Sequence, residues 1–120
     1  MSFRLTKAFT FEAAHALPYV AEDHPCRRMH GHSYRVEIHV EGEVDPTMGW
    51  VYDYQEINAA MQPLLNQLDH AYLNDLPGLE NPTSENLAAW LWQQLAPQCR
   101  GLREIVIQET SRARCSYRGT

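Results

Sequence analysis

The stretch Cys26-Arg27-Arg28-Met29-His30-Gly31-His32 runs directly into the alternating segment that decides the fold. From His32 to Glu41, one side of the segment continues in Tyr34, Val36, Ile38 and Val40, and the residues between them are polar. This alternation is the pattern of a β-strand with one buried face. His30 and His32 are two residues apart and therefore lie on the same side of that strand, the side that continues in Tyr34. The sequence thus predicts two imidazoles that can bind one metal ion at the end of an apolar surface.

A third histidine ends a second alternating segment, Phe9-Thr10-Phe11-Glu12-Ala13-Ala14-His15. If the two segments pair as strands, His15, His30 and His32 can converge on one ion. A catalytic zinc usually has three protein ligands and one open position, and neutral imidazoles also suit other divalent transition metals. We therefore expect a metal site, with zinc preferred. The alternative for the His-Gly-His motif alone is a turn at a strand start with solvated histidines.

The composition is that of one small globular domain. With 120 residues, of which 44% are hydrophobic, the chain is expected to form a single domain over residues 1–120 with a modest core. A formal net charge of -5 argues against a nucleic-acid partner, which needs a basic surface. The sequence has no apolar run of membrane-spanning length and no signal peptide, and its three cysteines do not suggest a disulfide framework. We therefore expect a cytoplasmic protein without a membrane partner.

Periodicity and breaker residues predict an α+β domain. The predicted elements are strands at about 3–15 and 32–42, a short extended piece at Trp50-Val51-Tyr52, a helix capped by Asp53, a helix capped by Thr83 or Ser84, and strands at about 102–110 and 115–118. Pro63 is expected to kink the first helix or mark its restart. This order predicts a four-stranded antiparallel sheet with two helices on one face. Its unpaired edges favour assembly into a closed oligomeric β-barrel, with the site between subunits.

Cys26 is the candidate base or nucleophile. It lies four residues before His30, and two arginines follow it. Positive neighbours and a nearby metal favour the thiolate form, in which Cys26 can accept a proton. Two other interpretations remain open: Cys26 is a fourth ligand that closes a structural zinc site, or it is a loop thiol without a role. Cys99 and Cys115 have no comparable surroundings and are predicted to be structural.

Three carboxylate and imidazole side chains later in the sequence are further candidates. An acid next to an imidazole, as in Asp69-His70, can orient the ring and relay protons for a cysteine. A histidine at a helix C-terminus also interacts favourably with the helix dipole, which is the structural alternative. Glu109 falls on the apolar face of its strand, where a charge needs a partner. That partner is either Arg112 or Arg114, or else the guanidine-like edge of a heterocyclic ligand, which a carboxylate binds through two parallel N–H groups.

Motifs over nearly the whole chain resemble one known family. They are the segment from Phe9 to His15, Cys26-x-x-x-His30-Gly31-His32, Leu68-Asp69-His70, Leu73-Asn74, Glu80-Asn81-Pro82-Thr83-Ser84-Glu85, Glu109-Thr110 and Tyr117-Arg118-Gly119. Together they resemble the 6-pyruvoyltetrahydropterin synthase family, and within it the bacterial branch that forms 6-carboxy-5,6,7,8-tetrahydropterin for queuosine biosynthesis. The short gap between the cysteine and the His-Gly-His motif favours this branch, because the gap is typically longer in the pyruvoyl-forming branch.

The resemblance implies a tunnelling fold, in which the sheets of several subunits join into a barrel, often in a hexamer that is a dimer of trimers. It also implies a zinc-dependent lyase that converts 7,8-dihydroneopterin triphosphate to 6-carboxy-5,6,7,8-tetrahydropterin, acetaldehyde and triphosphate. The implied roles are zinc binding by His15, His30 and His32, proton acceptance by Cys26 with Asp69 and His70 as its relay, and pterin anchoring by Glu109. Thr83 and Ser84 are helix caps first and candidate substrate-binding hydroxyls second.

Alternatives to this function remain at the level of sequence. A 6-pyruvoyltetrahydropterin synthase of the same fold would eliminate triphosphate without cleaving the side chain. A non-catalytic module that binds pterin or metal would need no thiol base. A structural zinc site made of Cys26 and the three histidines would have no open coordination position.

Overall fold

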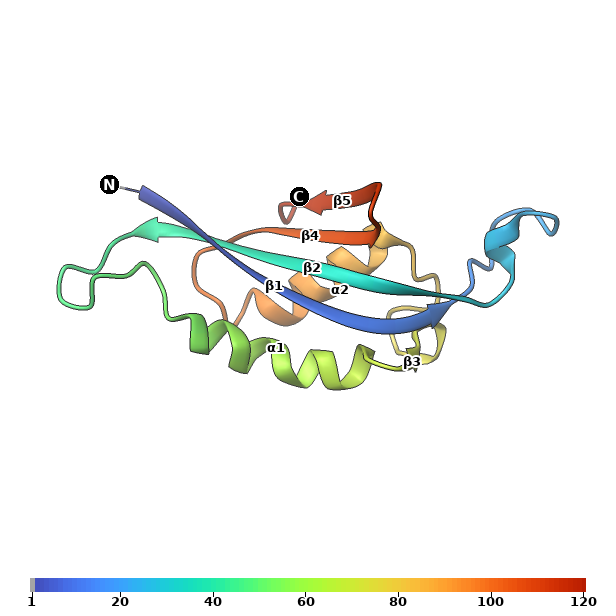
Figure 1. The fold of residues 1–120 in the computed structure, drawn as a ribbon, viewed down its shortest axis with the longest axis horizontal. Coiled ribbons are helices and arrows are strands. Elements are labelled where there is room, and N and C mark those ends of the chain that lie inside the picture. The colour runs from blue at the N-terminus through green and yellow to red at the C-terminus, as the bar shows by residue number, and fades with distance from the viewer. Residues whose placement is uncertain (1) are drawn as a thin grey trace.

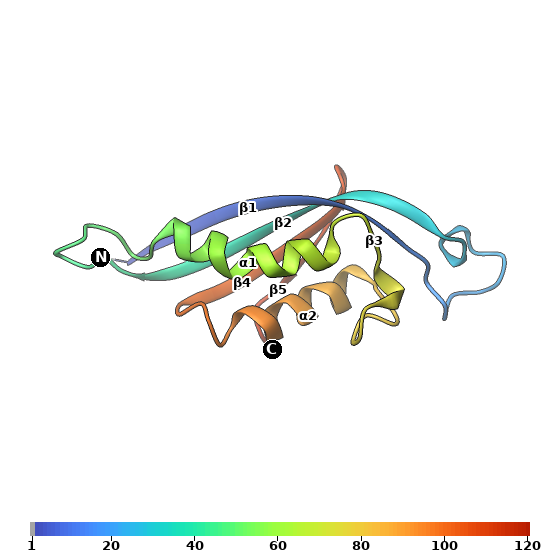
Figure 2. The ribbon, with the colours of Figure 1, turned by 90° about the horizontal axis from the view of Figure 1, so that it is seen from below.

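A single open sheet carries both helices on one of its faces (Figure 1, Figure 2). The structure is a computed structural model that describes residues 2–120. Its elements are β1 (Ser2–His15), β2 (His30–Glu43), α1 (Tyr54–Leu68), β3 (Ala71–Tyr72), α2 (Ser84–Leu95), β4 (Leu102–Thr110) and β5 (Ala113–Tyr117), with short 3-10 helices at Pro25–Arg27 and Leu73–Asp75. The strand order is β3-β1-β2-β4-β5. The predicted α+β class, with two helices on one face, is confirmed.

The longest feature of the fold is the antiparallel ribbon of β1 and β2, which gives the molecule its elongated shape of 57 × 23 × 23 Å. The pairing runs without interruption from Ser2 opposite Glu43 to His15 opposite His30. β2 begins two residues earlier than the alternation alone predicts, so His30 lies inside the strand. The alternate side chains that face the helices are buried, and Val36 and Ile38 are fully enclosed. The sheet therefore extends one continuous apolar face from the core to its histidine-bearing end.

Both helices begin at side-chain caps. The Asp53 carboxylate accepts the N–H of Gln55, and the Thr83 hydroxyl accepts the N–H of Asn86. Pro63 lies inside α1, which nevertheless continues unbroken to Leu68. The helix therefore does not restart at Pro63. The proline deprives the Ala59 carbonyl of its N–H partner, but Ala59 and Pro63 are both exposed, so water can satisfy that carbonyl.

Three local features differ from the sequence-based expectations. The sheet has a fifth strand, β3, which pairs with β1 in parallel at only two positions. The segment Trp50-Val51-Tyr52 is not a strand but a bend, which follows the turn that the Asp45 side chain closes by accepting the N–H groups of Thr47 and Met48. The last strand is Ala113–Tyr117 instead of 115–118. Neither helix among residues 2–120 is long and apolar enough to cross a membrane.

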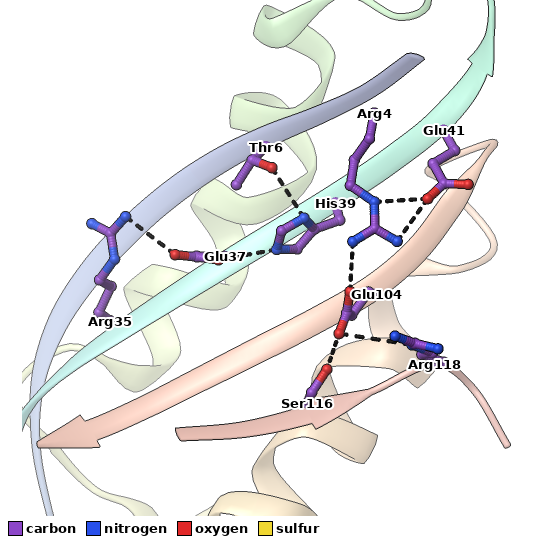
Figure 3. A network of polar contacts seen from close by, with 9 residues as sticks. All are labelled: Arg4, Thr6, Arg35, Glu37, His39, Glu41, Glu104, Ser116 and Arg118. Atoms are coloured by element: carbon purple, nitrogen blue, oxygen red, sulfur yellow. Dashed lines mark hydrogen bonds and ion pairs between the residues drawn. The ribbon is translucent and has the colours of Figure 1, made fainter. Parts of the chain in front are cut away.

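The face of the sheet opposite the helices is held by polar contacts between strands (Figure 3). Arg4 on β1 donates to Glu41 on β2 and to Glu104 on β4, both at 2.7 Å. Glu104 also accepts the hydroxyl of Ser116 and pairs with Arg118 at 3.8 Å. Glu104 is only 7% exposed, so its charge depends on these partners. The network links β1, β2, β4 and the end of the chain without a covering layer.

A second polar chain on this face predicts a pH dependence of stability. Glu37 accepts from His39 at 3.0 Å and from Arg35 at 3.3 Å, and His39 in turn contacts the Thr6 hydroxyl. Burial by itself raises the pKa of Glu37, but the hydrogen bonds from His39 and Arg35 outweigh burial and hold that pKa below its usual range. Because the folded-state pKa is lowered, this contribution is complete above the unfolded-state pKa and is lost as the pH falls through the folded value.

We expect Glu37→Gln to flatten the acid limb of the stability curve. Urea denaturation from neutral pH down to about pH 3, below the ordinary carboxyl pKa, should show a smaller loss of unfolding free energy for this variant than for the wild type. The exposed Glu22 provides the matched control, and Glu22→Gln should follow the wild-type curve. Identical acid limbs for Glu37→Gln and the wild type would contradict the inferred role of Glu37.

Candidate functional site

Three histidines converge where β1 ends and β2 begins. His15 and His30 are direct cross-strand partners, and His32 lies diagonally opposite His15 on the same face. One ligand nitrogen from each residue falls in a group whose members lie within 4.8 Å of one another. The Nε2 atoms of His15 and His32 are 3.1 Å apart. The convergence expected from the alternation is therefore present in the fold.

The hydrogen bonds behind the rings suit metal binding. Nδ1 of His15 is 2.8 Å from the Pro82 carbonyl, and Nδ1 of His30 is 2.8 Å from the Arg28 carbonyl. A carbonyl oxygen can only accept, so both Nδ1 atoms carry the proton and both Nε2 atoms keep a free lone pair. Burial lowers the pKa of His15, which favours the neutral, ligating form. Since tetrahedral zinc separates ligand nitrogens by roughly 3.3 Å, the donor set fits such an ion.

Tyr34 is a contact of the site that the sequence-based prediction did not assign. Its hydroxyl lies 3.2 Å from Nδ1 of His15, and its ring stacks on Phe11 with centroids 4.9 Å apart. Burial, assisted by the charge of Glu109, raises the pKa of Tyr34, so the phenol stays protonated. The period of two from His32 to Tyr34 was the available signal. The Pro82 carbonyl had no comparable signal, because a backbone acceptor 67 residues from His15 leaves no mark on the sequence.

Glu109 faces the histidines. Its Oε1 is 3.7 Å from Nε2 of His15 and 4.0 Å from Nε2 of His32. The register between β4 and β5 shifts at this residue, so Glu109 has no paired residue on β5. Among the described residues, no ion pair joins Glu109 to Arg112 or Arg114, so the structural alternative for this carboxylate is not supported.

Cys26 lies in the 3-10 turn of the loop between β1 and β2 and is partly exposed. Its N–H donates to Nδ1 of His24 at 3.0 Å, and its carbonyl accepts the N–H of Leu17 at 2.8 Å. Both backbone groups of Cys26 therefore have hydrogen-bond partners, and these bonds do not involve the thiol. Within residues 2–120, the group of potential metal ligands contains the three histidines and not Cys26. A closed site with Cys26 as fourth ligand is thus not the arrangement of this chain.

Asp69 and His70 form an exposed pair at the edge of the sheet. Oδ2 of Asp69 is 3.1 Å from Nδ1 of His70, and the His70 side chain is 80% exposed. The N–H of Glu12 on β1 donates to Asp69 and is the main cause of the lowered pKa of that carboxyl. The N–H of His70 donates to the Glu12 carbonyl, which holds His70 at a φ of 60°. This conformation costs a non-glycine residue about 1–3 kcal/mol.

The same fold that brings the histidines together leaves the Asp69-His70 pair apart from them. Within residues 2–120, no hydrogen bond or ion pair connects His70 to Cys26 or to the three histidines. Thr83 and Ser84 are linked to the histidines, because the carbonyl of Pro82, the residue before Thr83, is hydrogen-bonded to Nδ1 of His15. The Thr83 oxygen serves as the helix cap and keeps its own O–H proton for another acceptor.

Comparison with known proteins identifies the family. The sequence profile described as 6-pyruvoyl tetrahydropterin synthase matches residues 4–120. This chain belongs to that family. A 6-carboxy-5,6,7,8-tetrahydropterin synthase from Synechocystis sp. is 42% identical over 117 residues, which cover 92% of this chain and 89% of that protein. A dihydroneopterin monophosphate aldolase from Pyrococcus furiosus is 31% identical over 101 residues, with 84% and 82% covered.

The solved structures agree with this assignment. The 6-pyruvoyl tetrahydropterin synthase of Caenorhabditis elegans superposes with a TM-score of 0.92 at 28% identity, over 100% of this chain and 97% of that one. The predicted family is confirmed, and so is the fold of the single chain as that of a tunnelling-fold subunit. The chain is therefore an enzyme, a pterin-processing lyase of the 6-pyruvoyl tetrahydropterin synthase family. Enzymes of this family depend on a metal, and the histidine group described above can hold one.

For this family member we predict that His32→Ala weakens binding of divalent transition metals by at least about 100-fold. Removing a ligand should cost more than the 10- to 100-fold typical of a residue that only supports one. His39 lies on the opposite face of the same strand, so His39→Ala is the matched control. Competition with a chromophoric chelator measures both affinities. Equal affinities in the two variants would contradict the ligand assignment.

Proposed function

We propose that this protein is a zinc-dependent 6-carboxytetrahydropterin synthase of queuosine biosynthesis in the cytoplasm. The reaction would convert 7,8-dihydroneopterin triphosphate and water to 6-carboxy-5,6,7,8-tetrahydropterin, acetaldehyde and triphosphate. The observation that carries the proposal is the joint placement of three histidine nitrogens and the Glu109 carboxylate at one strand end. The similarity to the Synechocystis enzyme supports the same choice.

Two parts of the site would bind the substrate. The Glu109 carboxylate would accept two parallel N–H groups from the amino-pyrimidine edge of the pterin and fix the ring beside the histidines. Thr83 and Ser84 would offer hydroxyl groups from the start of α2, which the Pro82 carbonyl ties to His15. A zinc ion held by His15, His30 and His32 would supply Lewis-acid chemistry to a side-chain oxygen of the substrate.

Cys26, Asp69 and His70 would move the protons. Cys26, as the thiolate, would accept a proton from the substrate side chain, and His70 would pass protons on. The Asp69 carboxylate can only accept a hydrogen bond, so Nδ1 of His70 carries its proton and Nε2 is left free to exchange one. Carbon–carbon cleavage of the aldol-reversal type needs a base and a stabiliser of negative charge on the same two-carbon unit, and this set of residues supplies the base.

We further propose that each site is completed by a neighbouring subunit. The His70 imidazole is mostly exposed, and within residues 2–120 no hydrogen bond or ion pair joins it to Cys26. Among the residues that the structure describes, β1 has a strand partner on its outer side only at Ala13 and Ala14, and β5 forms the other edge of the sheet. Pairing of these edges between copies would close a barrel and remove both free edges. A hexamer built as a dimer of trimers is the assembly that we propose.

Product analysis tests the reaction. Purified zinc-loaded protein, incubated with 7,8-dihydroneopterin triphosphate, should release acetaldehyde and yield the 6-carboxy product, both identified by mass spectrometry. Cys26→Ala should reduce the rate by about 100-fold or more, the range for loss of a general base. Cys115→Ala, which alters a thiol on β5, is the control and should keep the wild-type rate.

The possible contradicting results are distinct. A 6-pyruvoyl product without acetaldehyde would favour the function of the Drosophila melanogaster 6-pyruvoyl tetrahydrobiopterin synthase, which is 34% identical over 132 residues. Pterin binding without turnover by the wild type, unchanged in Cys26→Ala, would favour a non-catalytic module.

Mixing two inactive variants tests whether the sites are shared. If Cys26 and His70 of one site come from different subunits, co-assembled Cys26→Ala and His70→Ala chains should recover about one quarter of wild-type activity, because random mixing makes that share of sites complete. Each variant alone is expected to be nearly inactive and serves as the control. Failure of the mixed assemblies to regain activity would place both residues in the same subunit.

A further inference from the structure

The phenol of Tyr34 lies between the histidines and the apolar core. The side chain is 1% exposed, and its ring stands edge-on to those of His15 and His32, with centroids 6.0 and 5.5 Å away. Stacking on Phe11 at an interplanar angle of 11° fixes the ring from the other side. Tyr34 is therefore held by the sheet and the core, and its hydroxyl has a defined position beside Nδ1 of His15.

The direction of the hydrogen bonds at His15 can be assigned. The Pro82 carbonyl at 2.8 Å can only accept, so the proton of the neutral imidazole is on Nδ1. The Tyr34 oxygen, at 3.2 Å from the same nitrogen, is then a second acceptor for that N–H group. The two acceptors come from different parts of the fold, one from the segment before α2 and one from β2. Both lie on the side of the ring away from the proposed metal position.

We propose that Tyr34 is a positioning residue for the metal ligand His15, an inference that rests on the metal site of the proposed function. The terminal torsion of a histidine is broad and roughly two-fold, so the ring by itself can rotate or flip and exchange its two nitrogens. A single carbonyl in a loop restrains that torsion through one contact. The Tyr34 oxygen adds a contact from a rigid strand, keeps the ring plane in place and keeps Nε2 directed toward His32.

Positioning His15 in this way lowers the stability of the metal-free protein, because it leaves the Tyr34 O–H donor without a partner. When the Tyr34 oxygen accepts from His15, its own proton has no hydrogen-bond acceptor among residues 2–120, and a buried donor without an acceptor is unfavourable. Tyr34→Phe removes that donor and keeps the ring that stacks on Phe11. A merely structural hydroxyl and a positioning hydroxyl therefore predict different results for this variant.

The test compares Tyr34→Phe with the wild type in metal binding and in metal-free stability. We expect the affinity for zinc, measured by competition with a chromophoric chelator, to fall about 10-fold, at the lower end of the range for residues that support a ligand. The visible absorption bands of the cobalt-substituted protein should change in position or intensity. The thermal midpoint of the metal-free variant should not fall.

Tyr52→Phe is the matched control, because it removes a tyrosine hydroxyl that is also hydrogen-bonded, here as a donor to the Gln98 carbonyl at 3.3 Å, but that has, among the described residues, no hydrogen bond to the histidines. It should leave the zinc affinity and the cobalt spectrum unchanged. Zinc affinity within twofold of the wild type in Tyr34→Phe would overturn the proposal, and so would a fall in metal-free stability that accounts for the whole loss. If zinc binding changes as expected but the wild type forms no carboxypterin, the proposed 6-carboxytetrahydropterin synthase reaction fails and the role of Tyr34 stands.

Discussion

The site depends on the antiparallel pairing of β1 with β2 in a single register. This register places His15 opposite His30 and leaves His32 diagonal to His15 on the same face. A slip by one residue would turn one strand's apolar side chains to the outer face and would separate the histidines. Burial of Phe11, Val36 and Ile38 against the helices therefore also fixes the geometry of the metal ligands. Folding energy and site geometry are determined by the same contacts.

The two faces of the sheet differ in what stabilises them, and only one of them carries the histidines. The helix-covered face is apolar, and at its end the histidines lie beside a buried phenol. The opposite face is polar and is held by the contacts of Arg4 and Glu104, which link β1, β2, β4 and β5 (Figure 3). A face that satisfies its own charges needs no covering layer. Such a sheet can stay open in the subunit and is suited to an assembly in which this face lines a polar interior.

The strained position of His70 illustrates how local structure can serve the shared site that we propose. The backbone of Glu12 accepts the His70 N–H and donates to Asp69, so the edge of β1 holds both residues. The imidazole then extends into solvent with its Nδ1 fixed by the carboxylate. A left-handed conformation at a histidine persists only where the surroundings impose it. This arrangement is consistent with a side chain that is prepared for use by a neighbouring subunit.

The amino-acid sequence by itself determined the α+β class, the cap residue Asp53, and the shared face of His30 and His32, because period, capping and alternation are local properties. It left the cap of the second helix open between Thr83 and Ser84, and the structure shows Thr83. The short parallel strand β3 was not foreseen, since two residues carry no periodic signal. Only the tertiary structure decided that the Pro82 carbonyl and the Tyr34 hydroxyl meet at Nδ1 of His15, and that Glu109 faces the histidines instead of an arginine. These contacts join residues far apart in the chain, and their geometry depends on strand register and helix packing, which no local pattern encodes.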